Sequence, residues 1–242
     1  MRTLKLADLN VRVTGGTDRE GGGDGPLVVL LHGFGAPGDD LVPLWRQLDV
    51  PRDTRFAFPE APLELAGLGY GDARAWWMID VMALERAVRD GTLRDRSKEV
   101  PEGMEDARVQ VEAMLGELEH ELGAAPQRLI LGGFSQGAML SCDLALRSDR
   151  PLSGLVLLSG TLLAEDQWTA LAPRRRGLEV LQSHGRDDPL LSFAQAERLR
   201  DLLREAGLTV RFQPFNGGHG IAPSALDALG KFVTERAQIS RA

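Results

Sequence analysis

RLILGGFSQG (residues 128–137) decides the fold of this 242-residue chain. Its first half is a short apolar run typical of a buried strand, and residues 138–146 are apolar on nearly every side, which predicts a buried helix. Ser135 therefore lies where a strand turns sharply into a helix, and the flanking glycines leave space where the two nearly collide. A serine in this context matches a nucleophile elbow.

Apolar runs typical of strands recur along the chain, and segments of helical periodicity lie between them. This alternation predicts an α/β fold with a mostly parallel central sheet and helices on both faces. Residues 3–13 fit one or two edge strands. Ser192 and Gln195 predict a capping box that opens a helix. The expected core strands are 26–31, 55–59, 128–132, 155–160, 178–184 and 209–215, and the expected helices include 41–48, one opening at 101, and one ending near Gly207.

Residues 60–101 contain no run typical of a core strand. They include a highly charged segment, residues 85–99. A connection of about forty residues inside a compact domain is often functional. We therefore expect one domain over residues 1–242, with a cap or one wall of a cleft at about 60–101.

The composition excludes several classes of protein. A net charge of −7 argues against a nucleic-acid partner, which needs a basic face. Cys142 is the single cysteine, so no disulfide forms within the chain and a cysteine-built metal site is not expected. The sequence lacks an apolar stretch of about 20 residues, which predicts no stable membrane insertion and a cytoplasmic protein.

Four polar side chains follow predicted strands directly. They are His32, Ser135, Asp188 and His219. In mostly parallel sheets, ligands bind beyond the carboxyl ends of the strands. The four side chains therefore predict an active site at that edge.

A serine hydroxyl needs a base to take its proton and a carboxylate to orient that base. His219 lies between glycines in a loop free to reach over the sheet edge, which favours it as the base. Asp187 and Asp188, after the preceding strand, are both candidates for the acid. Serine, aspartate and histidine follow one another in the order found in α/β-hydrolases.

The other three histidines have simpler interpretations. His120 falls on an amphipathic helix and is expected at the surface, whereas His32 and His184 each precede a glycine at a strand end and are expected to brace loops.

The transition state also needs donors for its oxyanion. Two backbone N–H groups are candidates: that of Gln136, directly after the serine, and that of Phe34, in a glycine-bearing loop.

The combined motifs resemble the phospholipase/carboxylesterase family, which includes acyl-protein thioesterases. The resemblance runs from about Leu27 to the last helix. The motifs are HGFG (32–35), PEAP (59–62), WW (76–77), GGFSQG (132–137), LSG (158–160), HGRDDP (184–189) and GH (218–219).

This resemblance implies an α/β-hydrolase fold and a serine carboxylic-ester hydrolase that needs no cofactor. It assigns the acid to Asp188, with Asp187 as runner-up, and implies oxyanion roles for Phe34 and Gln136. Two departures concern the substrate: Met78 and Ile79 stand between the paired tryptophans and Asp80, and residues 85–99 are longer and more charged than in the compact thioesterases.

We expect a small-molecule substrate, a short-to-medium acyl ester or thioester. The oligomeric state stays open, with a homodimer as one option. The candidates for an acyl pocket are Leu63, Leu65, Trp76, Trp77 and Met78.

Two other interpretations compete with the hydrolase. Gly33, Gly35 and Gly38 fit the G-x-G-x-x-G fingerprint of a dinucleotide-binding oxidoreductase, but Asp39 and Asp40 would place negative charge near the pyrophosphate. A non-catalytic binding protein on the hydrolase fold is the second, and a lost nucleophile would be its signature.

Overall fold

The computed structural model describes residues 1–91 and 95–239. Eight of its strands form one sheet in the order β1-β2-β4-β3-β7-β8-β9-β10. The sheet strands are β1 (Arg2–Leu6), β2 (Leu9–Gly15), β3 (Leu27–Leu31), β4 (Arg55–Pro59), β7 (Leu129–Phe134), β8 (Gly154–Leu158), β9 (Glu179–Gly185) and β10 (Thr209–Phe215).

Strand direction divides this sheet into two parts. β1 and β2 form an antiparallel hairpin, and β2 pairs antiparallel with β4. From β4 to β10, every neighbouring pair is parallel. The mostly parallel sheet with an edge hairpin agrees with the prediction, and the parallel strands bring their carboxyl ends to one edge.

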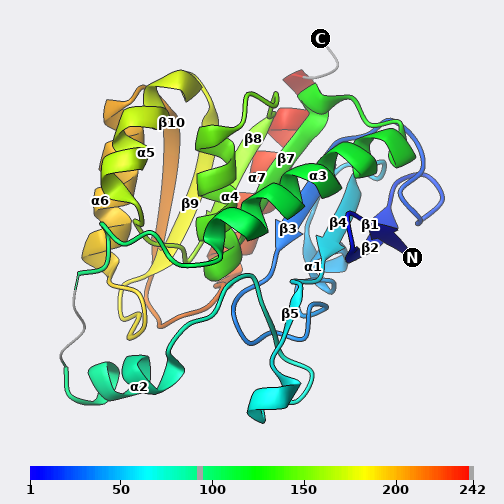
Figure 1. Ribbon diagram of the computed structural model, residues 1–242. Helices are drawn as coiled ribbons and strands as arrows, with labels where there is room; N and C mark the ends of the chain where they lie inside the picture. Colours follow the sequence, from blue (N-terminus) through cyan, green and yellow to red (C-terminus); the bar gives the residue numbers. More distant parts are fainter. Residues whose placement is uncertain (92–94, 240–242) are drawn as a thin grey trace.

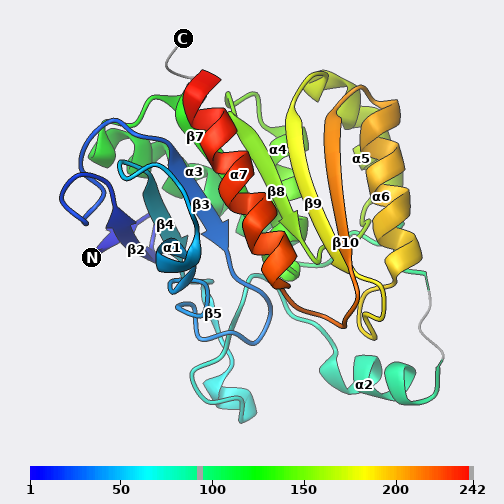
Figure 2. The same cartoon turned by 180° about the vertical axis from the view of Figure 1, so that it is seen from behind.

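Helices cover both faces of the sheet (Figures 1 and 2). One face carries α3, α4, α5 and α6, and the other carries α1 and α7. The helices are α1 (Leu44–Gln47), α2 (Val81–Arg89), α3 (Met104–Leu122), α4 (Gln136–Arg147), α5 (Glu165–Leu171), α6 (Phe193–Glu205) and α7 (Pro223–Ile239).

Successive residues of the central strands pack on opposite faces of the sheet. Within β3, Leu27, Val29 and Leu31 belong to the core under α3 and α4, while Val28 and Leu30 belong to the core under α7. All five side chains are at most 1% exposed. A strand buried on both faces must be apolar at every position, which explains the continuous apolar runs of the sequence.

The segment at about 60–101 lies outside the large sheet. It contains the short antiparallel pair β5 (Leu63–Glu64) and β6 (Arg74–Ala75), and then α2. In both views, β5 and α2 lie at the lower end of the molecule, beyond the strands (Figures 1 and 2).

Three local expectations differ from the structure. The long helix begins at Met104 rather than at residue 101, and α1 is shorter than residues 41–48. The capping-box prediction at α6 is wrong. Ser192 precedes the helix, but its side chain makes no capping hydrogen bond. The Gln195 side chain donates instead to Asp95 Oδ1 at 2.8 Å, because a tertiary partner outcompetes the local one.

Candidate active site

Ser135 lies at a strained turn between β7 and α4. Its φ of 52° and ψ of −116° lie in a region that L-residues rarely adopt. A Cβ added to Gly133 would lie 2.5 Å from the Leu31 carbonyl oxygen, and one added to Gly137 would lie 2.1 Å from the same atom. The two glycines therefore allow β3, β7 and α4 to approach one another around the serine.

A continuous hydrogen-bonded chain links three side chains from distant parts of the sequence. Ser135 Oγ lies 2.9 Å from His219 Nε2, and His219 Nδ1 lies 2.7 Å from Asp188 Oδ2. Ser135 follows β7, Asp188 follows β9, and His219 follows β10. The common carboxyl edge of the sheet thus brings these residues together.

Asp188 is tightly held inside the protein. Its side chain is fully buried, and its Oδ1 accepts hydrogen bonds from the N–H groups of Leu190 and Leu191 at 2.9 and 3.0 Å. Burial alone would raise the pKa of Asp188, but hydrogen bonds from His184, His219 and the Leu191 N–H outweigh burial and hold this pKa well below its usual range. Asp187, in contrast, is exposed.

The loops that carry Asp188 and His219 are joined by their backbones. Arg186 N–H donates to Phe215 C=O at 2.9 Å, and Asp187 N–H donates to Gly217 C=O at 3.0 Å. A Cβ on Gly185 would lie 2.2 Å from the Gly218 carbonyl oxygen, so this close approach requires glycine. The two loops therefore continue the β9–β10 pairing past the ends of the strands.

A residue of the LSG motif to which the sequence assigned no role fixes the other side of the histidine loop. Ser159 follows β8, and its hydroxyl donates to Gly220 C=O at 2.7 Å. Ser159 is fully buried and has a φ of 51°. The contact joins residues 61 positions apart, so no local pattern signals it.

The loop after β3 passes beside Ser135. A Cβ on Gly33 would lie 3.3 Å from Ser135 Cβ, which places this loop against the elbow. Gly35 has a φ of 82°, and its N–H donates to Arg74 C=O at 2.8 Å. Within the described residues, no backbone carbonyl accepts the N–H of Phe34 or of Gln136.

The Gln136 side chain connects the elbow to the paired tryptophans. Its Oε1 accepts the Trp76 N–H at 2.9 Å, and its Nε2 donates to Trp77 C=O at 2.8 Å. From the sequence, Gln136 was expected to contribute only its backbone N–H. Its side chain additionally holds the tryptophan segment against the start of α4.

His32 links the loop after β3 to the segments that contain Ala61 and Trp76. Its ring is buried, its Nδ1 donates to Gly33 C=O at 2.8 Å, and its Nε2 accepts the Ala61 N–H at 2.9 Å. Burial lowers the pKa of His32. The Trp76 indole N–H donates to His32 C=O at 2.9 Å. His120 is exposed on α3.

Two cavities flank this region and share Met78 and Ile79. Leu190 and Leu191, which hold Asp188, also line the larger one. The larger cavity, of about 440 Å³, is lined by Trp77, Met78, Ile79, Leu84, Asp95, Arg96, Pro101, Glu102, Met139, Thr161, Leu163, Leu190, Leu191, Ser192, Ala194, Gln195 and Arg198. The smaller, of about 260 Å³, is lined by Phe34, Leu68, Tyr70, Met78, Ile79, Asp80, Val81 and Met82.

The five acyl-pocket candidates fall into two groups. Trp77 and Met78 line the larger cavity. Leu63, Leu65 and Trp76 line neither cavity. Leu63 is 38% exposed on β5, Leu65 packs with Ala73 and Ala75, and Trp76 is buried behind the elbow. The segment therefore contributes its second tryptophan and the following methionine to the cavity wall.

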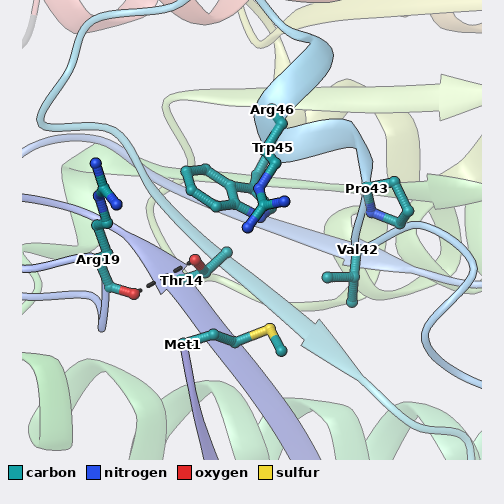
Figure 3. A pocket seen from close by; sticks show the side chains of 7 residues that line it. All are labelled: Met1, Thr14, Arg19, Val42, Pro43, Trp45 and Arg46. Carbon is teal, nitrogen blue, oxygen red and sulfur yellow. Dashed lines mark hydrogen bonds between the residues drawn. The ribbon is translucent and has the colours of Figure 1, made fainter.

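A third cavity, of about 500 Å³, lies beside α1, away from the hydrogen-bonded chain. Figure 3 shows Trp45 with Arg46 stacked over its ring, and Arg19 and Met1 nearby. No candidate site residue lines it.

The glycines at 33, 35 and 38 lack the setting of a dinucleotide fingerprint. Such a fingerprint opens a helix, whereas α1 begins only at Leu44 and spans a single turn.

No group of three or more His, Cys, Asp or Glu side chains within residues 1–91 and 95–239 is placed to hold a metal ion. Over the same residues, every helix is too short or too polar to cross a lipid bilayer.

Cys142 is fully buried on α4, and burial raises the pKa of its thiol.

Comparison with known proteins gives one consistent family. The model of the phospholipase/carboxylesterase family matches residues 20–236. "Acyl-protein thioesterase 1" of Neurospora crassa is 28% identical over 216 residues, which cover 86% of each chain. "Probable carboxylesterase SOBER1-like" of Arabidopsis thaliana is 27% identical over 219 residues, 88% of this chain and 80% of the relative. The crystal structure of esterase PE8 superposes with a TM-score of 0.79 at 30% identity, covering 94% of this chain and 98% of that one.

Proposed function

The chain belongs to the phospholipase/carboxylesterase family, and on that premise we propose that it hydrolyses short-to-medium acyl esters or thioesters through a Ser135–His219–Asp188 triad. Its relatives are named as carboxylesterases and acyl-protein thioesterases, and the chain is an enzyme of this hydrolase class. One observation carries the proposed mechanism. It is the unbroken hydrogen-bonded chain from Ser135 Oγ through the His219 ring to the buried Asp188 carboxylate.

In the proposed reaction, His219 Nε2 takes the Ser135 proton as the serine oxygen attacks the substrate carbonyl carbon. His219 Nδ1 donates to Asp188, which fixes the tautomer that leaves Nε2 free to accept this proton. The protonated ring then gives its proton to the departing alcohol or thiol, and an acyl-enzyme forms on Ser135. Water, activated by the same ring, releases the acid and restores the serine.

The N–H groups of Phe34 and Gln136 are proposed to bind the oxyanion. Both flank the elbow, and neither is used by a backbone carbonyl of the described residues. The strained turn at Ser135 presents the oxygen at the start of α4, where the helix dipole also favours developing negative charge. Asp188 stays ionised across the working pH range because its pKa is held low.

The larger cavity is proposed to accept the acyl chain. The part of its wall nearest the hydrogen-bonded chain is apolar: Met139 lies one turn along α4 from Ser135, and Leu190 and Leu191 hold Asp188. Trp77 and Met78 also line the cavity. A volume of about 440 Å³ suits an apolar acyl group rather than a small acetyl group alone.

Hydrolysis of p-nitrophenyl esters with acyl chains from two to sixteen carbons tests this proposal, alongside the matching acyl-thioesters. We expect turnover without added metal or cofactor, and a loss of about 10³-fold or more in Ser135→Ala. Ser141→Ala is the matched control, since Ser141 lies on α4, the helix that follows Ser135, and its buried hydroxyl donates to the Gly137 carbonyl.

An active Ser135→Ala variant would refute the serine mechanism. A folded wild type inert toward every ester and thioester of the series would refute the proposed substrate class.

A further inference from the structure

A second histidine approaches the buried carboxylate of Asp188. His184 lies on β9, and its side chain is completely buried. Its Nε2 lies 2.9 Å from the Leu191 carbonyl oxygen and 3.3 Å from Asp188 Oδ2. Asp188 Oδ2 therefore faces two imidazoles, that of His219 at 2.7 Å and that of His184.

The partners of His184 determine which ring nitrogen carries the proton. A carbonyl oxygen and a carboxylate oxygen can only accept, so Nε2 must be the donor. Nδ1 has no hydrogen-bond partner within the described residues, although it is buried. Burying an unpaired polar nitrogen is unfavourable, and an apolar ring of similar size would avoid this cost. The polar contacts of the ring are thus confined to Nε2.

The contacts of Nε2 close a small cycle around the acid. Leu191 gives its N–H to Asp188 Oδ1 and receives the His184 N–H on its carbonyl. Asp188 is therefore bounded on the Oδ1 side by the Leu190 and Leu191 N–H groups, and on the Oδ2 side by the two rings. Leu191 also lines the 440 Å³ cavity, so the cycle joins the acid to the cavity wall.

We propose that His184 is a positioning residue for ester hydrolysis: its Nε2–H holds the Asp188 carboxylate and the Leu191 carbonyl in the arrangement that orients His219. This inference rests on the proposed triad and extends it to a fourth side chain. His184 is not itself part of the cavity lining, and its polar contacts are with Asp188 and Leu191, so it acts through these two residues.

The role predicts a particular kinetic signature. Without the His184 donor, the carboxylate loses one of its restraints, and His219 is less well oriented during proton transfer. We expect the loss mainly in kcat, because His184 is not among the residues that line the cavity. A phenyl ring removes the buried, unpaired Nδ1 but also leaves the Leu191 carbonyl without its donor, so we expect these two effects on stability to offset each other in part.

Two variants of His184 separate the hydrogen bond from packing. His184→Phe keeps an aromatic ring but removes the donor, whereas His184→Gln keeps a donor at about the reach of Nε2. We expect His184→Phe to lower kcat about 10- to 100-fold with KM changed less than about threefold. His184→Gln should recover most of the lost rate. Gln182→Met on the same strand is the control, since its buried amide bonds Ala196 C=O on α6 instead.

A double-mutant cycle with Asp188→Ala tests whether His184 acts through the acid. In the Asp188→Ala background, adding His184→Phe should change kcat less than about threefold. An equal loss in both backgrounds, or a wild-type kcat in a folded His184→Phe, would overturn the proposal. If His184→Phe does not fold, a folded His184→Gln variant whose kcat falls about 10-fold or more, while Gln182→Met keeps the wild-type kcat, would also overturn the proposal. Ser135→Ala, measured in parallel, keeps the two proposals apart: an inactive Ser135→Ala with an unaffected His184→Phe refutes only the role of His184.

Discussion

The side chain of Gln136 is hydrogen-bonded to the main chain of Trp77: its Nε2 donates to the Trp77 carbonyl at 2.8 Å. The same side chain accepts the N–H of the preceding tryptophan at 2.9 Å. Gln136 therefore satisfies two backbone groups of a segment that has few strand partners of its own. The position of the cavity wall depends directly on the residue that follows the serine.

Replacing Gln136 by methionine should move this wall. The variant keeps the Gln136 backbone N–H but leaves the Trp76 N–H and the Trp77 C=O unpaired in a buried setting. We expect kcat/KM to fall about 10-fold or more on long acyl esters, with a smaller loss on acetyl esters. Tryptophan fluorescence should shift in the same variant.

Gln110→Met is the matched control, because Gln110 also bonds a backbone carbonyl, that of Ala7, on the distant side of the molecule. Equal losses on acetyl and long-chain esters would contradict a role of Gln136 in shaping the cavity.

Ser159→Ala should loosen the histidine loop. The change removes the hydroxyl that donates to Gly220 C=O, adjacent to His219. We expect kcat to fall about 3- to 30-fold, because a neutral hydrogen bond contributes about 1 kcal/mol and His219 must stay aligned with Ser135. Thr234→Ala removes a similar hydroxyl-to-carbonyl bond on α7, to Gly230, and should leave kcat unchanged. Steady-state kinetics of the two variants test this expectation, and equal kcat values for Ser159→Ala and Thr234→Ala would contradict a role of Ser159 in aligning His219.

Gly137→Ala should be among the most damaging single substitutions in the chain. The added Cβ would lie 2.1 Å from the Leu31 carbonyl oxygen, an atom of the central strand that cannot move aside. Overpacking of this kind costs several kcal/mol. Gly67→Ala provides the comparison, since its Cβ meets open space. Urea unfolding should show a large drop in the free energy of unfolding for the first and a change below about 0.5 kcal/mol for the second.

Stability at acid pH should depend on Asp188. The pKa of Asp188 is lowered in the folded protein, whereas in the unfolded chain it is about 3.9. Its ionised form therefore stabilises the fold fully above about pH 4 to 5, and this contribution is lost as the pH falls below 4 towards the folded pKa. The difference in unfolding free energy between wild type and Asp188→Asn should be constant from pH 7 to 5 and then shrink. A difference that grows on acidification would contradict the lowered pKa.

The fold was predictable from the sequence because its core strands are buried on both faces. Strands such as β3 must be apolar at every position, so the runs stand out without an alignment. The positions of Ser135, Asp188 and His219 follow from the same logic, since a parallel sheet brings strand ends together. Their roles in hydrolysis remain predictions that the proposed assays test.

The supporting contacts were not predictable, because their partners are distant in the sequence. Gln136 and Trp77 are 59 residues apart, and Ser159 and Gly220 are 61 apart. His184 was expected only to brace a loop, and its approach to Asp188 appears only in three dimensions. The capping box failed for a related reason: Gln195 has a tertiary partner, Asp95, that no local pattern reveals.

Backbone hydrogen bonds between the loop that carries Asp188 and the loop that carries His219 limit which segments can be exchanged between this enzyme and its relatives. Residues 185–189 and 216–220 are held together by Arg186 N–H on Phe215 C=O and by Asp187 N–H on Gly217 C=O. Grafting either loop alone from a relative would replace half of a joined pair and would misplace the remaining half. A chimera should therefore exchange both loops as one module. Directed evolution of the rate would likewise gain most from libraries that vary the two loops together.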